Sequence, residues 1–279
     1  MEMTPVVTMM VLGAALLHAS WNAIIKSSRD VMLDTALVAA GAGVLSLPLA
    51  ALLPVPARES WPYLGASVAI HVGYFATLVA AYRIGDLGHA YPLMRGTAPL
   101  LVALFGIALL DERPSATMWL GILLISAGIL SIGLLQRGRA QLGATIWALA
   151  NAVIIATYTL VDGAGARLSG TSTGYGTWMF WLQGVPFVLL VGVLRRRAAL
   201  DYAKRNWQRG LGGGFCLVSS YGIVLWAMTQ APVAAVAALR ETSVIFAALL
   251  GAVFLREPFG RPRVIGACAV ALGVMALRL

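Results

Sequence analysis

Long uninterrupted runs of apolar residues make up most of the chain, and short polar stretches separate them. A helix that crosses the hydrocarbon core of a bilayer needs about 20 predominantly apolar residues. Ten segments of this kind can be marked, at 5–25, 32–53, 62–82, 89–110, 115–135, 141–161, 173–194, 208–229, 233–255 and 262–278. They are too long and too continuously apolar for the alternating strands of a membrane barrel. The pattern therefore predicts an all-α integral membrane protein with ten transmembrane helices.

Composition supports this class, because 60% of the 279 residues are hydrophobic and only 11% are charged. That leaves too little polar surface to cover a soluble globule of this size. The connections between the segments are short, so we expect no soluble domain. The first segment lacks a basic region before it and a convincing cleavage site after it, and we interpret it as a retained span rather than a signal peptide.

The formal charge of +9 comes from basic residues in the short connections. With ten spans, 14 of the Lys and Arg residues fall on one face and 4 on the other, and the cluster "RRRAALDYAKRNWQR" at 195–209 dominates the difference. The positive-inside rule makes the first face cytoplasmic and places both termini outside. We expect this charge to meet anionic lipid and not nucleic acid, because no basic domain is available to hold a duplex.

The chain also repeats itself. Displacement by 145 residues lays "RGTAPLLVALFGIALLDE" (95–112) over "RETSVIFAALLGAVFLRE" (240–257), which matches Arg95 to Arg240 and Glu112 to Glu257. Charged residues are scarce here, so two charged matches in one register are informative. Five spans in each half is an odd number, and the second half must then cross the membrane in the opposite sense. We predict two inverted five-helix repeats, residues 1–137 and 138–279, with a substrate site near the midplane between them.

Both halves resemble the repeat unit of the drug/metabolite transporter superfamily, in its ten-span EamA branch. Each half has an apolar fourth span that ends in Glu, in "LLDERP" and "FLREPF", followed by a fifth span with "GILLISAG" or "GACAVALG". The opening "LLHASWNAIIKSS" is similar to the first span of that family. The resemblance implies a carrier for amino acids, drugs, nucleotide sugars or phosphorylated sugars. Many relatives are described with cytoplasmic termini, which differs from the loop count above.

Polar and aromatic residues three and four apart share a helix face, and such faces are candidates to line a cavity. The alternatives are hydrogen bonds between helices for the amides and an interfacial belt for the aromatic residues. With the charged residues of the fourth and ninth spans, the candidate substrate-binding residues are Trp21, Asn22, His71, Tyr74, Arg95, Trp147, Asn151, Tyr158, Trp178, Arg240 and Glu241.

Arg95 and Arg240 are costly inside a membrane, at about 2.5–3.5 kcal/mol for a central arginine. Inversion of the repeats predicts one arginine towards each mouth of the cavity, where each would hold a substrate carboxylate, close a gate or snorkel to headgroups. Glu241 follows Arg240 directly, so we expect the two to project from different faces, and they need not pair with each other. For Glu112 and Glu257 we predict a structural role at the helix ends, with pairing to basic neighbours. Gly121, Gly128, Gly266 and Gly273 are predicted points of close helix packing.

The expected function is secondary transport, namely alternating-access export of amino acids or similar small metabolites across the bacterial inner membrane. Drug efflux and transport of phosphorylated solutes are the alternatives within carriers, and a channel or an intramembrane enzyme is the alternative outside them. No phosphate-binding G-x-x-x-x-G-K-[ST] loop appears, so an ATP-driven pump is disfavoured. Proton coupling and facilitated exchange both stay open. Neither Cys216 nor Cys268 has a metal-binding spacing, and we expect no cofactor, no metal and a functional monomer.

Overall fold

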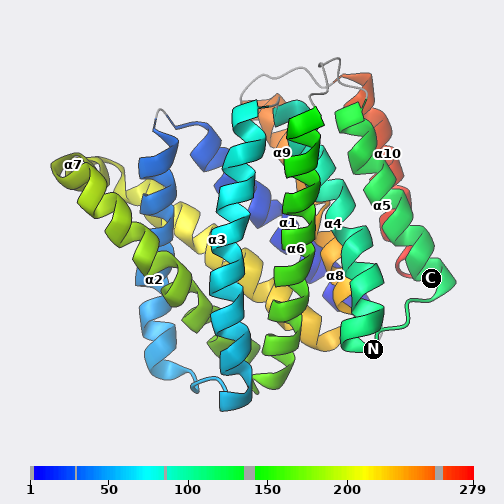
Figure 1. Cartoon of the computed structure of the whole chain (residues 1–279), viewed down its shortest axis with the longest axis horizontal. Coiled ribbons are helices and arrows are strands. Elements are labelled where there is room, and N and C mark those ends of the chain that lie inside the picture. The colour runs from blue at the N-terminus through cyan, green and yellow to red at the C-terminus, as the bar shows by residue number, and fades with distance from the viewer. Residues whose placement is uncertain (1–2, 29, 85–86, 135–141, 255–259) are drawn as a thin grey trace.

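The computed structural model describes residues 3–28, 30–84, 87–134, 142–254 and 260–279, and every element in these ranges is helical. The elements are α1 (Pro5–Lys26), α2 (Val31–Leu52), η1 (Arg58–Ser60), α3 (Trp61–Ile84), α4 (Leu87–Leu110), α5 (Ala116–Leu134), α6 (Leu142–Leu168), α7 (Ser172–Gln230), α8 (Val233–Arg240), α9 (Ser243–Phe254) and α10 (Arg261–Ala276). The helices form one bundle whose connections alternate between two ends, as Figure 1 shows for α1–α2 at the upper end and α2–α3 at the lower end.

Side-chain caps define several helix starts. The hydroxyl of Thr4 accepts from the amide of Val7, and Pro5 follows as the first helical residue of α1. Asp30 caps α2 by accepting from the amide of Leu33, and Thr171 caps α7. These residues satisfy amides that have no partner inside the helix, which a membrane segment cannot leave bare.

Three predicted spans differ from their expected form. The seventh and eighth run together as the 59-residue α7, which bends at Arg196 (φ 39°, ψ −116°) and at Asn206 (φ −123°, ψ 16°). The basic cluster between them is therefore an exposed helical connection and not a loop. The ninth span divides into α8 and α9. Seven helices in the described ranges are long and apolar enough to cross a membrane, and α7 is one of them, so ten separate spans remain a prediction.

Helix α8 occupies the centre, and all of its residues are buried. Around it α1 packs on α7 and α9, α4 packs on α5 and α6, and α3 packs on α6. The large core cluster joins apolar residues of α1, α4, α5, α6 and α7 to those of α8. A short helix at the centre of the bundle places its C-terminal residues far from bulk water.

The pair α5 and α10 is held by the four predicted glycines. A Cβ added to Gly121 would lie 2.9 Å from the carbonyl oxygen of Gly273, and one added to Gly128 would lie 2.8 Å from that of Gly266. The two backbones therefore touch without intervening side chains, and the prediction of close packing at these glycines is confirmed. Because the lower number on α5 meets the higher number on α10, the two helices run antiparallel.

Candidate substrate site

The ninth predicted span is interrupted where its charged residues lie. The amides of Glu241 and Thr242 bond to carbonyls three residues back, and the hydroxyl of Thr242 donates to the carbonyl of Leu239 at 2.8 Å. Thr and Ser side chains compete with the helical backbone for such acceptors. The sequence Arg-Glu-Thr-Ser therefore ends α8 at Arg240, and α9 begins at Ser243.

Arg95 of α4 and Arg240 of α8 meet at the carboxylate of Glu241. Arg95 Nε lies 2.6 Å from Glu241 Oε2, and Arg240 Nη2 lies 3.3 Å from Glu241 Oε1. The side chain of Glu241 is fully buried, and those of the arginines are 7% and 4% exposed. Arg240 and Glu241 follow each other in sequence, and the break after α8 lets their side chains pair. The expectation of one arginine towards each mouth was wrong, because both reach one central carboxylate.

This arrangement carries more positive than negative charge, and some of its hydrogen-bond donors have no acceptor among the described residues. Two guanidinium groups face one carboxylate, which leaves one net positive charge in a buried place. Arg95 Nη2, Arg240 Nε and the indole nitrogen of Trp21 are buried donors without a hydrogen-bond partner among the described residues. Buried donors are usually paired. The arrangement can thus accept an anionic group with several oxygen atoms.

Aromatic residues surround the arginines. His18 lies within electrostatic range of both Arg95 and Arg240, and its ring packs edge-on against Trp21 at 5.1 Å between centroids. Tyr74, Tyr91 and Tyr158 lie within electrostatic range of Arg95. Tyr91 is a member of this group that the sequence analysis did not select.

Asn151 takes the alternative role considered for the amides, a hydrogen bond between helices, whereas Asn22 bonds within its own helix. Asn151 Nδ2 donates to the carbonyl of Tyr74 at 3.0 Å and to the hydroxyl of Thr77 at 2.8 Å, and so ties α6 to α3. Asn22 Nδ2 donates to the carbonyl of His18 within α1. His71 packs against Tyr158 at 4.4 Å between ring centroids, and its Nδ1 lies 2.8 Å from the carbonyl oxygen of Ser67.

Two of the candidate tryptophans lie on exposed sides of the bundle. Trp147 is 41% exposed on α6, and Trp178 is 40% exposed on α7. Trp178 lines an apolar groove of about 470 Å³ between α7 and Leu47 of α2. Both side chains are therefore partly exposed on the outside of the bundle and lie away from the arginines.

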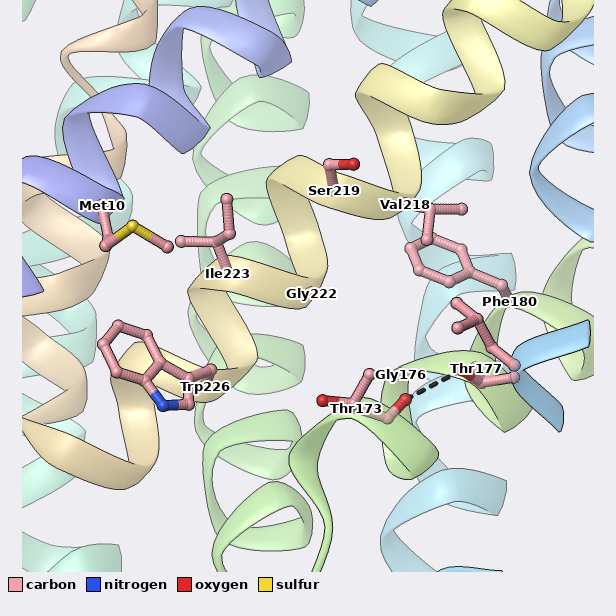
Figure 2. Close-up of a pocket in the computed structure, with 11 residues that line it drawn as sticks. Met10, Thr173, Gly176, Thr177, Phe180, Val218, Ser219, Gly222, Ile223 and Trp226 are labelled. Atoms are coloured by element: carbon pink, nitrogen blue, oxygen red, sulfur yellow. Dashed lines mark hydrogen bonds between the residues drawn. The ribbon is translucent and has the colours of Figure 1, made fainter. Parts of the chain in front are cut away.

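A second cavity, of about 380 Å³, lies between α1, α2 and the two parts of α7 (Figure 2). Met10, Phe180 and Trp226 contribute apolar walls, and Thr173, Thr177 and Ser219 contribute hydroxyls. None of the residues selected from the sequence lines it.

Glu112 joins the end of α4 to α6 and α8, at the end of the bundle that carries few basic residues. Its Oε1 accepts from Arg167 at 2.7 Å and from the amide of Val233 at 2.8 Å, and its Oε2 accepts from the amide of Ala234 at 3.3 Å. It therefore caps the N-terminus of α8, where a negative charge is favoured. The basic partner is the distant Arg167, while the adjacent Arg113 lies near Asp111 on the surface. Glu257 lies outside the described residues.

Comparison with known protein families shows the family of this chain. The model of the EamA-like transporter family matches residues 6–134 and 142–279. This chain belongs to that family. The two matches coincide with the two halves that the repeat at 145 residues predicts, and the family indicates a multi-pass membrane transporter of the drug/metabolite type.

The EamA fold also appears in solved structures. A crystal structure aligns over 98% of both chains with a TM-score of 0.76 and 20% sequence identity. Likeness at this identity shows the fold alone. The comparison with curated proteins found no match.

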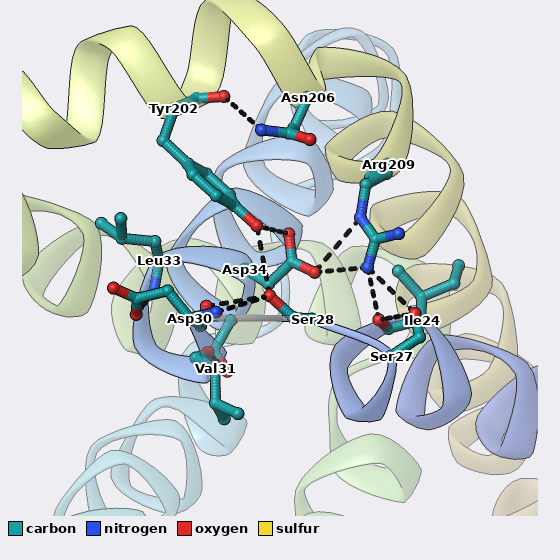
Figure 3. Close-up of polar contacts among 11 residues, drawn as sticks. Ile24, Ser27, Ser28, Asp30, Val31, Leu33, Asp34, Tyr202, Asn206 and Arg209 are labelled. Carbon is teal, nitrogen blue, oxygen red and sulfur yellow. Dashed lines mark hydrogen bonds and ion pairs between the residues drawn. The ribbon is translucent and has the colours of Figure 1, made fainter.

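Two further polar clusters of this EamA-like chain bring together residues that the sequence analysis did not connect. Asp34, at the start of α2, accepts from Arg209 Nη2 at 2.7 Å and from the hydroxyl of Tyr202 at 3.0 Å. Figure 3 shows that the same guanidinium donates to the carbonyl of Ile24 and the hydroxyl of Ser27, at the end of α1. This cluster ties α1, α2 and α7 together at the basic end of the bundle.

The other cluster contains Asp162, which the sequence analysis missed. The predicted sixth span ended at residue 161, but α6 continues to Leu168 and keeps Asp162 inside the bundle. Asp162 is fully buried and accepts from the hydroxyls of Tyr175 and Tyr221. One signal could have found it, since Asp162 lies one turn beyond Tyr158 on the face that Asn151 begins.

Proposed function

We propose that this chain is a secondary transporter that exports amino acids or similar small metabolites across the bacterial inner membrane. The observation that carries this proposal is the meeting of Arg95 and Arg240 at Glu241, with buried guanidinium donors left over. Planar guanidinium groups bind carboxylates in bidentate fashion. A substrate carboxylate would use the free donors, while the aromatic groups around Arg95 would contact its side chain.

The proposed mechanism is alternating access between two inverted repeats, residues 1–137 and 138–279. The glycine contacts support it. Displacement by 145 residues makes Gly121 equivalent to Gly266 and Gly128 equivalent to Gly273, and the contact of Gly121 with Gly273 is matched by the contact of Gly266 with Gly128. An exchange of partners of this kind is what a two-fold axis produces. The packing of α4 on α6 likewise has its counterpart in the packing of α1 on α9. An axis of this kind between opposed halves is the arrangement that inverted repeats give a carrier.

Conservative substitution of the two arginines tests the proposed site. Arg95→Lys and Arg240→Lys keep the charge but lose the planar fork, so we expect both variants to insert normally and lose transport by about tenfold or more. Uptake into vesicles and the amount of inserted protein are the two measurements. Arg113→Lys, at a side chain that is 85% exposed, is the matched control. Parental transport in both variants would show that the arginines only anchor their helices.

A growth screen tests the substrate class. We expect bacteria that express the chain to resist toxic amino-acid analogues and dipeptides. Cationic dyes are included in the same screen, and resistance to the dyes alone would reject the amino-acid proposal in favour of drug efflux. Arginine pairs also bind phosphate, so transport of a phosphorylated solute is the second candidate, and inhibition of amino-acid counterflow by phosphorylated sugars would favour it.

The proposed orientation has both termini outside the cytoplasm. A C-terminal fusion to alkaline phosphatase should therefore be active, and a fusion to green fluorescent protein should be dark, because neither reporter works on the wrong side of the membrane. The reason is the excess of basic residues at the α1–α2 and α7 end of the bundle. A fluorescent fusion with an inactive phosphatase would reverse the orientation.

A further inference from the structure

Asp162 is a buried carboxylate that the proposed substrate site does not use. The hydroxyl of Tyr221 donates to its Oδ2 at 2.6 Å, and that of Tyr175 donates to its Oδ1 at 3.3 Å. The exposed fraction of Asp162 is 0%. Each carboxylate oxygen thus accepts from a neutral tyrosine hydroxyl, and both tyrosines come from α7, one from each of its two parts.

No Lys or Arg forms an ion pair with Asp162 in the described part of the chain, although other buried carboxylates there have one. The groups that face it are Ser67 and His71 of α3 and the two tyrosines of α7. Arg240 of α8 acts on Tyr221 at longer range, and Arg167 of α6 is held by Glu112. The ionised form of Asp162 therefore has no full positive charge beside it unless His71 is protonated.

Two opposed effects act on this carboxylate. Burial removes the hydration that stabilises an ionised carboxylate, which favours uptake of a proton. The neighbouring hydroxyls of Tyr175, Tyr221 and Ser67 stabilise the ionised form through hydrogen bonds. The balance of these effects depends on the access of water to the carboxylate.

Polar and aromatic contacts connect Asp162 with the arginine pair. Gln183 of α7 has its Nε2 3.2 Å from His71 Nδ1 and 3.3 Å from the hydroxyl of Ser67. The ring of His71 packs on Tyr158, which lies within electrostatic range of Arg240. A change of charge at Asp162 can thus influence the substrate site through the hydrogen bonds and ring packing of His71 and through the electrostatic range of Tyr158.

We infer that Asp162 is the proton-binding site that couples export to the proton gradient, an inference that rests on the proposed transport function. A proton from the outer water would bond to a carboxylate oxygen of Asp162 and would displace the hydrogen bond of the tyrosine on that oxygen. After reorientation the O–H bond breaks, and the proton leaves to the cytoplasmic water. One proton enters for each substrate that leaves, and no other reactant is needed.

Infrared spectroscopy of the full chain in lipid vesicles tests proton binding without a substrate. The C=O stretch of a protonated carboxylic acid should appear as the pH is lowered from mildly alkaline to mildly acidic, and Asp162→Asn should remove that component. Asp201→Asn, at an exposed carboxylate of α7, is the matched control. Tyr221→Phe removes the shorter donor and should move the titration of the same component to higher pH. Spectra of Asp162→Asn that titrate like the parent would overturn the inference.

Transport of radiolabelled L-leucine in the same vesicles tests the coupling. We expect a pH gradient to drive leucine accumulation in the parent, and we expect Asp162→Asn to lose this response while it keeps leucine counterflow, which needs no net proton movement. Asp162→Glu should restore part of the response. A gradient response that survives in Asp162→Asn would overturn the coupling. Absence of leucine counterflow in the parent would instead count against the amino-acid proposal, and the infrared titration would still decide whether Asp162 binds the proton.

Discussion

Glu241→Ala is expected to lower the stability of the protein more than any other substitution in the polar centre, by about 3–5 kcal/mol. The reason is that Arg95 and Arg240 would lose their shared carboxylate and remain as two buried positive charges. Thermal unfolding of the purified protein in detergent measures the effect as a fall in the midpoint temperature.

A matched set of variants tests whether unpaired charge causes the loss of stability in Glu241→Ala. Glu59→Ala, at an exposed residue of η1, should leave the midpoint unchanged. Addition of Arg240→Leu to Glu241→Ala removes one of the unpaired charges and should recover part of the loss. If Glu241→Ala unfolds at the parental temperature, Glu241 does not hold the arginines together.

The second large effect is expected at the contact of α5 with α10. Gly128→Ala places a Cβ 2.8 Å from the carbonyl oxygen of Gly266 and 3.0 Å from the Cβ of Ala269, so the two helices must move apart. We expect a loss of about 1–3 kcal/mol, with a similar loss for Gly266→Ala, whose Cβ would lie 2.7 Å from the carbonyl oxygen of Gly128.

Gly13→Ala is the control for this prediction, since nothing lies within 4 Å of the added Cβ. Replacement of a helical glycine by alanine at an open position raises stability by about 0.4–1 kcal/mol. The sign of the change should therefore differ between Gly13 and Gly128 when both variants are unfolded by heat in the same detergent. Equal midpoints would mean that α5 and α10 are not in backbone contact.

The class of fold could be predicted from the sequence because the bilayer imposes a simple requirement on length and polarity. The repeat at 145 residues was also readable, since Arg95 and Arg240 are rare charges in an apolar background, and the family match covers both halves. The join of two predicted spans in α7 could not be predicted, because hydropathy marks where a chain leaves the membrane and not whether the helix stops there.

The details of the site depended on local geometry that periodicity does not contain. Helical spacing places Arg240 and Glu241 on different faces, and only the break after α8 brings them together. Glu112 was readable as a helix end, but its partner Arg167 lies 55 residues away in sequence. Asp162 was missed because a charged residue just after an apolar run is ordinarily outside the membrane.

The excess charge of the centre would make the proposed carrier responsive to membrane voltage. Arg95, Arg240 and Glu241 carry one net positive charge when all three are ionised. A charge that experiences the full potential gains or loses about 2.3 kcal/mol per 100 mV. In the proposed alternating-access mechanism, reorientation changes which aqueous side this charge faces, so the fraction of the field that it crosses changes too. An interior-negative potential would then favour the empty carrier open to the cytoplasm, the state in which the proposed exporter would load its substrate.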